Sequence, residues 1–252
     1  MDAVTAATPE LARLKARLAR QFDLITEPVP VGPLRVQFTR VADPQAVLDQ
    51  ICAAIDLHEK TTGQRVKGDS LGLPYWAELW DSAIGIGAWL VKHGPLDDRP
   101  ADESNRPAGR QRVLDLGCGM GLAGTVAAML RADVLFADLE PACLLFARLN
   151  GLRYSEHVAA RRTNWQTDDL RQKFDLIIGS DVLYDRTQWP HLDAFFRRHL
   201  ADNGRVLLGE PGRQSGDDFL PWLTDKGWTI ARHEQPVPTR SRPIRLIELT
   251  DE

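Results

Sequence analysis

The sequence predicts an α/β protein built on a doubly wound, mainly parallel sheet. From residue 112 onward, short apolar runs alternate with helical patterns, which is typical of strand–helix–strand units. The last two apolar runs, 228–235 and 244–250, have no helical pattern between them, so they are expected to pair antiparallel. We therefore expect a seven-stranded sheet with an antiparallel last strand, preceded by an N-terminal α+β cap.

The cap is expected to occupy residues 1–93. Apolar residues at helical spacing predict an amphipathic helix over 9–22, and an alternating pattern predicts a strand over 33–41. Further helices are expected over 43–57, which begins with an aspartate and a proline, and over about 80–92.

Residues 94–111 are charged and rich in proline and glycine, which predicts a flexible surface loop between the cap and a core over 112–252. Hydrophobic patterning predicts the elements of this core. The first five strands are expected at 112–116, 133–138, 158–165, 174–180 and 204–210, with helices at 121–131, 141–152, 189–200 and 216–226.

Composition argues against several classes of protein. The formal net charge of −4 does not suggest a nucleic-acid partner, and no apolar run approaches the roughly 20 residues of a membrane span. The N-terminus has no apolar core typical of a secretory leader, so a cytoplasmic location is expected. Cys52, Cys118 and Cys143 are isolated and the histidines are dispersed, so neither a disulfide framework nor a metal site is expected.

The stretch VLDLGCGMGLAG contains two glycine patterns at once. The frame from Gly119 is G-x-G-x-x-G, a dinucleotide signature, whereas the frame from Asp115 is D-x-G-x-G-x-G. The predicted strand ends near Leu116, so the turn begins at Gly117 and continues through Gly121. A dinucleotide frame would therefore begin two residues too late, and the sequence favours the frame that starts with the aspartate.

Carboxylates at the ends of the first two core strands indicate the kind of cofactor. Asp115 would be badly placed beside a pyrophosphate, but it could reach the ammonium group of an amino-acid-like cofactor such as S-adenosylmethionine, directly or through water. Asp138 follows Gly117 by 21 residues, a spacing that suits hydrogen bonds to ribose hydroxyls. NAD sites use such an acid too, so an NAD-dependent oxidoreductase remains an alternative.

With these motifs, the chain resembles the class I, seven-β-strand S-adenosylmethionine-dependent methyltransferases, which have a Rossmann-like fold. The supporting residues are DLGCGMG (115–121), Asp138 and SDVLY (180–184). PYWAELWDSA (74–83) and EPGR (210–213) are similar to the protein-lysine methyltransferase branch. The resemblance covers about residues 33–250. It implies S-adenosylmethionine as cofactor, S-adenosylhomocysteine as product, and a lysine side chain of a protein as methyl acceptor.

By this resemblance, Asp181 and Tyr184 form the D-x-x-Y motif of the substrate site and are the expected catalytic residues. Asp181 would orient the incoming amine and Tyr184 would shape its channel. Alternatively, Asp181 caps the following turn and Tyr184 packs on the sheet. Arg213 is expected either to stabilise the loop after the fifth strand or to meet an acidic substrate.

The resemblance also places Trp80 against the cofactor and Trp76 near the entrance, with Glu78 between them; alternatively, both tryptophans pin this segment to the sheet. Asn164 and Trp165 are expected at the adenine pocket, although Trp165 equally suits core packing. Cys118 is expected to contribute its backbone only. The expected cofactor-binding residues are Trp80, Asp115, Gly117, Cys118, Gly119, Gly121, Asp138, Leu139, Asn164, Trp165 and Ser180.

Two other functions share these cofactor features. A small-molecule N-methyltransferase would need a closed pocket, whereas a protein substrate needs an open groove. A non-catalytic module would bind the cofactor and transfer nothing. No nucleic-acid or membrane partner is expected, and the oligomeric state is left open.

Overall fold

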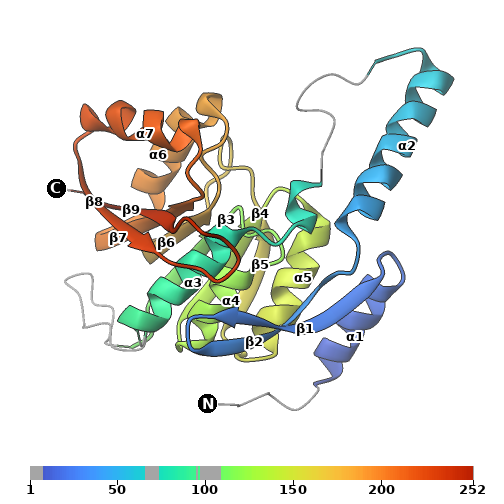
Figure 1. Cartoon of the computed structure of the whole chain (residues 1–252), viewed down its shortest axis with the longest axis horizontal. Coiled ribbons are helices and arrows are strands. Elements are labelled where there is room, and N and C mark those ends of the chain that lie inside the picture. Colours follow the sequence, from blue (N-terminus) through green and yellow to red (C-terminus); the bar gives the residue numbers. More distant parts are fainter. Residues whose placement is uncertain (1–7, 66–73, 95, 97–108, 252) are drawn as a thin grey trace.

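The computed structural model describes residues 8–65, 74–94, 96 and 109–251. The loop expected over 94–111 lies for the most part outside these residues. A seven-stranded sheet with the order β5-β4-β3-β6-β7-β9-β8 forms the centre of the molecule (Figure 1). Its strands are β3 (Arg112–Leu116), β4 (Asp133–Asp138), β5 (Val158–Arg162), β6 (Phe174–Ser180), β7 (Leu200–Glu210), β8 (Trp228–Gln235) and β9 (Ile244–Asp251).

The strand directions confirm the predicted fold class. Strands β3 to β7 pair in parallel, whereas β9 runs antiparallel to both β7 and β8. The chain moves outward from β3 through β4 to β5 and then returns to place β6 on the other side of β3. The loops that follow β3 and β6 therefore diverge at a topological switch point, where doubly wound sheets bind their ligands.

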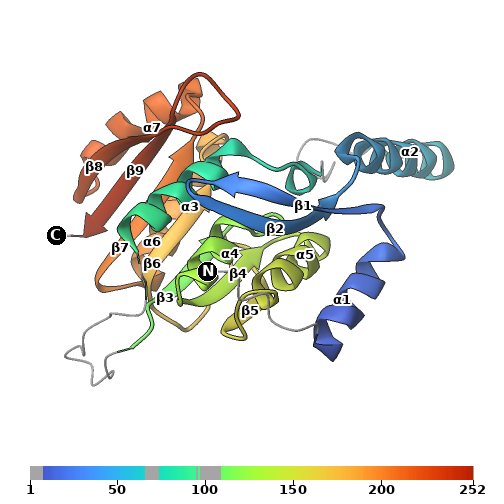
Figure 2. The ribbon, with the colours of Figure 1, turned by 60° about the horizontal axis from the view of Figure 1, so that its bottom comes forward.

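Helices cover both faces of the sheet (Figures 1 and 2). Side chains along β3 alternate between two apolar clusters: Val113 packs with the helices of one face, and Leu114 and Leu116 pack with those of the other. Burial on both faces explains why these strands read as short apolar runs. The helices are α3 (Asp81–His93), α4 (Leu122–Met129) and α5 (Pro141–Leu152) on one face, with α6 (Trp189–His199) and α7 (Gln214–Thr224) on the other.

A two-stranded hairpin, β1 (Leu24–Val31) and β2 (Leu34–Val41), packs against α3 and α5 (Figure 2). Only β2 was predicted. The sequence of β1 contains two prolines, which lack the N–H that a central strand donates, so its pattern did not suggest a strand. Proline is tolerated here because β1 pairs with β2 alone.

Asn150 of α5 fixes the hairpin to the core. Its Oδ1 accepts from Thr39 N at 2.8 Å, and its Nδ2 donates to Thr39 O at 2.9 Å. Helix α1 (Pro9–Ala19) packs beside the same helix. The predicted strand and first helix of the cap are thus held on α5.

Helix α2 (Pro44–Thr62) projects away from the sheet (Figure 1). It begins where the sequence predicted, because the Asp43 side chain accepts hydrogen bonds from the backbone of Gln45 and Ala46. It continues to Gly63, whose left-handed backbone ends it, so the helix is longer than predicted. No helix within the described residues is long and apolar enough to cross a bilayer.

Helix α1 ends three residues before the predicted position, and two predicted strand boundaries were also wrong. Strand β5 ends at Arg162 instead of residue 165, because the Asn164 N–H donates to Asp168 Oδ2 at 2.8 Å and turns the chain away from the sheet. Strand β7 begins at Leu200, four residues earlier than expected, directly after α6.

Candidate active site

The glycine loop after β3 adopts a backbone that requires glycine. Gly117, Gly119 and Gly121 all have left-handed φ angles, of 63°, 51° and 82°. A Cβ on Gly121 would lie 2.6 Å from the Ala147 Cβ, so a larger residue would collide with α5. These positions match the D-x-G-x-G-x-G frame that the sequence favoured.

Asp138 ties this loop to the end of β4. Its Oδ2 accepts from Gly119 N at 2.9 Å, and its Oδ1 accepts from Glu140 N at 3.0 Å. Burial raises the pKa of Asp138, although these backbone donors oppose the shift. The carboxyl is therefore fixed at the carboxyl end of the sheet, with further lone pairs available to a ligand.

Asp115, expected at the end of the first core strand, is in β3 but lies buried beneath the glycine loop. Its side chain is buried, its Oδ2 accepts from Gly124 N at 2.9 Å, and its Oδ1 has no partner among the described residues. Burial raises the pKa of Asp115 to about 8; the Gly124 N–H opposes this shift, and the nearby charge of Asp138 contributes to it. A cation bound close to Oδ1 would satisfy this atom and favour the ionised carboxylate.

Two thiols lie beside Asp138. The sulfur atoms of Cys118 and Cys143 and a carboxylate oxygen of Asp138 all lie within 4.8 Å of one another. Burial raises the pKa of Cys143 to about 11 and that of Cys118 well above its usual range, so both thiols keep their protons. Metal binding requires thiolates, and the absence of a metal site stays a prediction.

The residues expected at the adenine pocket follow β5 instead of ending it. The Trp165 indole N–H donates to Gln188 Oε1 at 3.0 Å, and its ring lies 3.5 Å from where a Cβ on Gly117 would stand. The Asn164 Oδ1 accepts from Gln166 N at 2.9 Å and closes its own turn. Leu139, next to Asp138, has an exposed side chain.

The upstream tryptophans have different surroundings. Trp76 packs against Phe22, which follows α1, and against Phe146 of α5, with ring centroids 5.5 and 6.0 Å away, so these contacts join it to the helices instead of the sheet. The Trp80 indole N–H donates to Tyr75 O at 2.9 Å, and the Arg213 guanidinium lies 5.6 Å from the ring centroid of Trp80.

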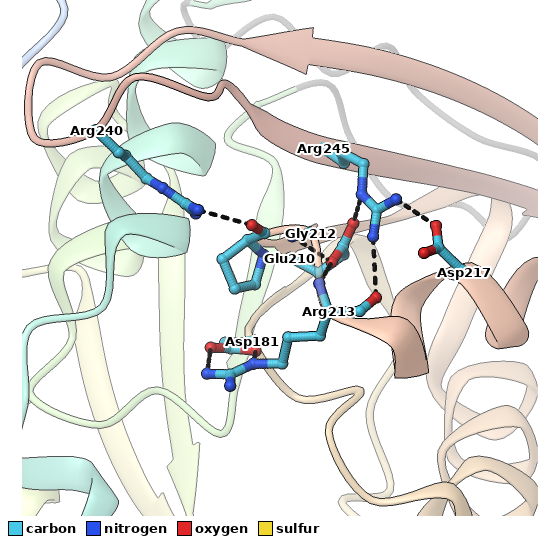
Figure 3. Close-up of polar contacts among 8 residues, drawn as sticks. Asp181, Glu210, Gly212, Arg213, Asp217, Arg240 and Arg245 are labelled. Carbon is cyan, nitrogen blue, oxygen red and sulfur yellow. Dashed lines mark hydrogen bonds and ion pairs between the residues drawn. The ribbon is translucent and has the colours of Figure 1, made fainter.

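Asp181 forms a bidentate ion pair with Arg213 (Figure 3). Arg213 Nε and Nη2 lie 3.0 and 2.8 Å from the two carboxylate oxygens, and the Asp181 side chain is only 5% exposed. The backbone of Asp181 has a φ of 55°, which is uncommon outside glycine and asparagine. The sequence identified both residues but not their pairing.

The loop that carries Arg213 is held by Glu210, which belongs to the EPGR motif but had no predicted role, and by Arg245, which was not predicted as a site residue. Glu210 is buried at the end of β7, and its Oε2 accepts from Gly212 N at 2.7 Å and from Arg213 N at 3.0 Å. Arg245 of β9 pairs with Glu210 and with Asp217 of α7 (Figure 3). No local pattern predicts this network, because Arg245 is 35 residues from Glu210.

An aromatic pair lies near Asp181. Tyr184 and Tyr75 are each 54% exposed, and their ring centroids are 6.1 Å apart. Tyr75 was not identified as a site residue, although it belongs to the PYWAELW segment. The hydroxyl of Ser180, at the end of β6, is buried without a partner among the described residues.

The site therefore lies at the carboxyl ends of β3, β4, β6 and β7, where these groups come together. A glycine cradle and the unpartnered polar atoms of Asp115 and Ser180 fit a cofactor that has a cationic amino-acid tail and no phosphate bridge. A cavity of about 320 Å³ lies elsewhere, between α7 and the β8–β9 pair, and neither the glycine loop nor Asp181 lines it.

Comparison with known proteins identifies the family of this chain. A family model described as lysine methyltransferase matches residues 63–225. The electron transfer flavoprotein beta subunit lysine methyltransferase of Xenopus laevis is 31% identical over 172 residues, which cover 66% of this chain and 60% of that protein. The protein N-lysine methyltransferase METTL21A of Xenopus tropicalis is 30% identical, with 63% and 71% covered.

The chain spans 53% and 60% of the zebrafish and Xenopus laevis flavoprotein methyltransferases that it matches. A TehB-like SAM-dependent methyltransferase from Corynebacterium glutamicum has the same fold, with a TM-score of 0.50, 18% identity, and coverage of 82% of this chain and 100% of that one. The family match covers well over half of the sequence and includes the glycine loop, Asp138 and the Asp181–Tyr184 segment. The chain thus belongs to the lysine methyltransferase family.

Proposed function

We propose that this protein transfers a methyl group from S-adenosylmethionine to a lysine side chain of a protein. The observation that carries the proposal is the position of Asp181 and Tyr184 at the end of β6, across the switch point from the glycine loop after β3. The glycine loop after β3 suits the methyl donor, and the loop after β6 suits a methyl acceptor. Both loops lie at the same edge of the sheet. The family and the names of the relatives support lysine as the acceptor.

When bound, S-adenosylmethionine supplies a methyl group on a positively charged sulfonium, which is already activated for displacement. On the protein side, Gly117, Gly119 and Gly121 give the backbone space for close approach. Asp138 would accept hydrogen bonds from ribose hydroxyls, and Asp115 would balance the charge of the amino-acid tail. Its buried Oδ1 atom has no other partner among the described residues, which supports this role.

The remaining predicted residues would surround the adenine and the acceptor. Trp165 lies beside Gly117 and would cover the base, with Asn164, Leu139 and Ser180 near it. Cys118 would contribute its backbone, and Trp80 would close the donor side. Their contacts with the cofactor are part of the proposal.

On the acceptor side, methyl transfer needs a neutral amine with a free lone pair. Asp181 would accept a hydrogen bond from this amine and orient it, while Tyr184 would pack along the alkyl chain. Because orientation alone lowers the barrier of such a displacement substantially, no covalent catalytic group is required.

Exposed aromatic rings favour a protein acceptor over a small molecule. Tyr75 and Tyr184 stand at the surface as a pair, which gives an extended side chain two aromatic faces to pack against. A closed pocket, as a small-molecule enzyme would need, is not built by these two residues.

The decisive experiment incubates the purified protein with methyl-labelled S-adenosylmethionine and a cell lysate, then separates protein from small molecules. Acid hydrolysis of the labelled protein should release methylated lysine. The matched control is Asp181→Asn, which keeps the shape of the side chain but removes its charge and should label little. Label found only in small molecules would favour the small-molecule alternative, and cofactor binding without any transfer would favour the non-catalytic module.

A further inference from the structure

Arg213 stands at the acceptor side of the site, where a positive charge changes the chemistry of an incoming amine. Its guanidinium binds both oxygens of Asp181 (Figure 3). It also lies over the ring of Trp80, 5.6 Å from the ring centroid. An aspartate alone would attract a protonated lysine and hold it as an ammonium ion, which has no lone pair for methyl transfer. An aspartate already paired with arginine has no net charge to offer.

We propose that Arg213 is a positioning residue that neutralises Asp181, so that the acceptor site selects the uncharged amine over the ammonium ion. Each carboxylate oxygen accepts one guanidinium N–H and keeps a further lone pair, so Asp181 can still orient an amine N–H. This inference rests on the proposed function, because it takes Asp181 as the group that meets the acceptor.

The backbone of Arg213 is held from three directions, which supports a fixed position for its side chain. Its N–H donates to Glu210 Oε2 at 3.0 Å, and its carbonyl oxygen accepts from Arg245 Nη2 at 3.0 Å and from Gly216 N at 3.0 Å. A Cβ on Gly216 would lie 2.6 Å from the Glu210 carboxyl carbon, so α7 and this carboxylate are packed closely.

Glu210 itself does not compete for the guanidinium of Arg213. Its Oε1 is paired with Arg245, and its Oε2 accepts the two backbone N–H groups of the loop. The side chain of Arg213 is therefore left to Asp181 and Trp80. The pairing with Asp181 also raises the pKa of Arg213, which keeps the guanidinium charged at any working pH.

Other ionisable groups lie near the pair. The charges of Asp185, Tyr75 and Asp138 act on Tyr184, and that of Glu210 acts on Arg213. Burial raises the pKa of Tyr184, so its hydroxyl is neutral around neutral pH. These groups are unchanged in every variant below, and a change in amine selectivity therefore reports on Asp181 and Arg213.

The test compares two small amines as probes of the site, with the protein saturated with S-adenosylhomocysteine so that no methyl is transferred. Ethylamine is a cation at neutral pH, whereas trifluoroethylamine is neutral there because fluorine withdraws electrons. Saturation-transfer NMR gives the affinity of each. For each variant, the ratio of the two affinities is divided by the same ratio for wild type. The effect of the size difference between the probes then cancels.

Arg213→Gln should shift this ratio about tenfold toward ethylamine, the change that corresponds to one pKa unit. Arg213→Lys should keep the wild-type ratio, because it retains the charge although it loses the planar fork. Asp181→Asn should shift the ratio in the opposite direction, toward trifluoroethylamine, because the Arg213 guanidinium then has no carboxylate partner and repels the ethylammonium ion. This variant tests the proposal even if Arg213→Gln folds poorly.

Arg205→Gln is the matched control. Arg205 also forms an ion pair, with Glu248 at 3.4 Å, and also lies over a tryptophan, 5.3 Å from the centroid of Trp89. Arg205 lies in the middle of β7, the strand that precedes the Arg213 loop, and its contacts are with residues outside the site, so its removal should leave the ratio unchanged.

A wild-type ratio in Arg213→Gln would overturn this role for Arg213. Equal loss of both amines in Arg213→Gln and Arg213→Lys would show that the residue only supports the loop, and would also overturn it. If wild type binds S-adenosylhomocysteine but neither amine, the acceptor site itself is wrong, and the proposed function fails together with this inference.

Discussion

The backbone N–H of Gly124 donates to Asp115 Oδ2 at 2.9 Å, while Asp115 Oδ1 stays buried without a partner in the part of the chain that the structure describes. The glycine loop thus covers a carboxyl whose pKa burial raises to about 8. Such a group costs free energy when it ionises alone, and less when a cation lies beside it. This relationship connects the stability of the loop to ligand charge and to pH.

Asp115→Asn should stabilise the cofactor-free protein at high pH. The pKa of Asp115 is about 8 in the folded state and about 4 in the unfolded chain, so the folded state binds its proton more tightly. Wild-type stability attributable to this group therefore falls as pH rises from about 4 to 8, and the asparagine variant lacks that loss. Urea unfolding at a series of pH values measures the difference.

The gain of Asp115→Asn over wild type should grow across that range and level off above it. Asp202→Asn, on the exposed part of β7, is the control and should show no such trend. A gain that does not depend on pH would contradict the raised pKa of Asp115.

Binding of S-adenosylhomocysteine at neutral pH should release a proton from Asp115. In the free protein the Asp115 carboxyl is largely protonated at neutral pH. The ammonium group of the bound ligand would favour the ionised form, so the carboxyl would lose its proton. Calorimetry in buffers of different ionisation enthalpy measures the released proton. The Asp115→Asn variant should bind the same ligand more weakly and release fewer protons on binding. Equal proton release in both proteins would exclude Asp115 as the group that meets the ammonium.

Asp138→Ala should weaken cofactor binding by about 1.5–3 kcal/mol, the range for hydrogen bonds to a charged group. The aspartate also accepts from Gly119 N, so Asp138→Asn is needed as a comparison that keeps an acceptor for the loop. Calorimetric titration with S-adenosylhomocysteine gives both affinities. Unchanged affinity in the alanine variant would count against the proposed contact with the ribose.

Gly121→Ala should destabilise the protein by more than about 2 kcal/mol, since it combines a left-handed backbone with a collision. The new Cβ would lie 2.6 Å from the Ala147 Cβ. Gly63→Ala is the matched control, because Gly63 has a φ of 69° and nothing within 4 Å of an added Cβ. Gly63→Ala should lower the free energy of unfolding by about 1 kcal/mol, which measures the cost of the left-handed backbone alone. Equal losses in urea unfolding would show that the loop can move away from α5.

Asp181→Asn should keep the affinity for S-adenosylhomocysteine and lose most methyl transfer, because its expected partner is the acceptor amine. The asparagine preserves the volume of the buried side chain next to Arg213, so a folding defect is less of a concern than with alanine. Two measurements on the same preparation test this prediction: calorimetry gives the affinity for S-adenosylhomocysteine, and the incorporation of labelled methyl groups into lysate protein gives the transfer activity. Normal turnover would remove Asp181 from the substrate site.

Sequence patterns alone predicted the sheet, the antiparallel last strand and the glycine loop. These features depend on neighbours along the chain: alternating apolar residues, a strand end next to glycines, and an aspartate at the next strand end. Strand β1 was missed because Pro28 and Pro30 remove two backbone donors and obscure its pattern, and only its pairing with β2 makes it a strand.

Tertiary structure decided which polar groups meet. Asp181 and Arg213 follow β6 and β7, which lie side by side, and Arg245 reaches Glu210 because β9 pairs with β7. These contacts join residues more than thirty positions apart, so no local spacing encodes them. The sequence determined which residues reach the carboxyl edge of the sheet, and the packing of its strands determined that an aspartate there is paired with arginine and that Asp115 is buried.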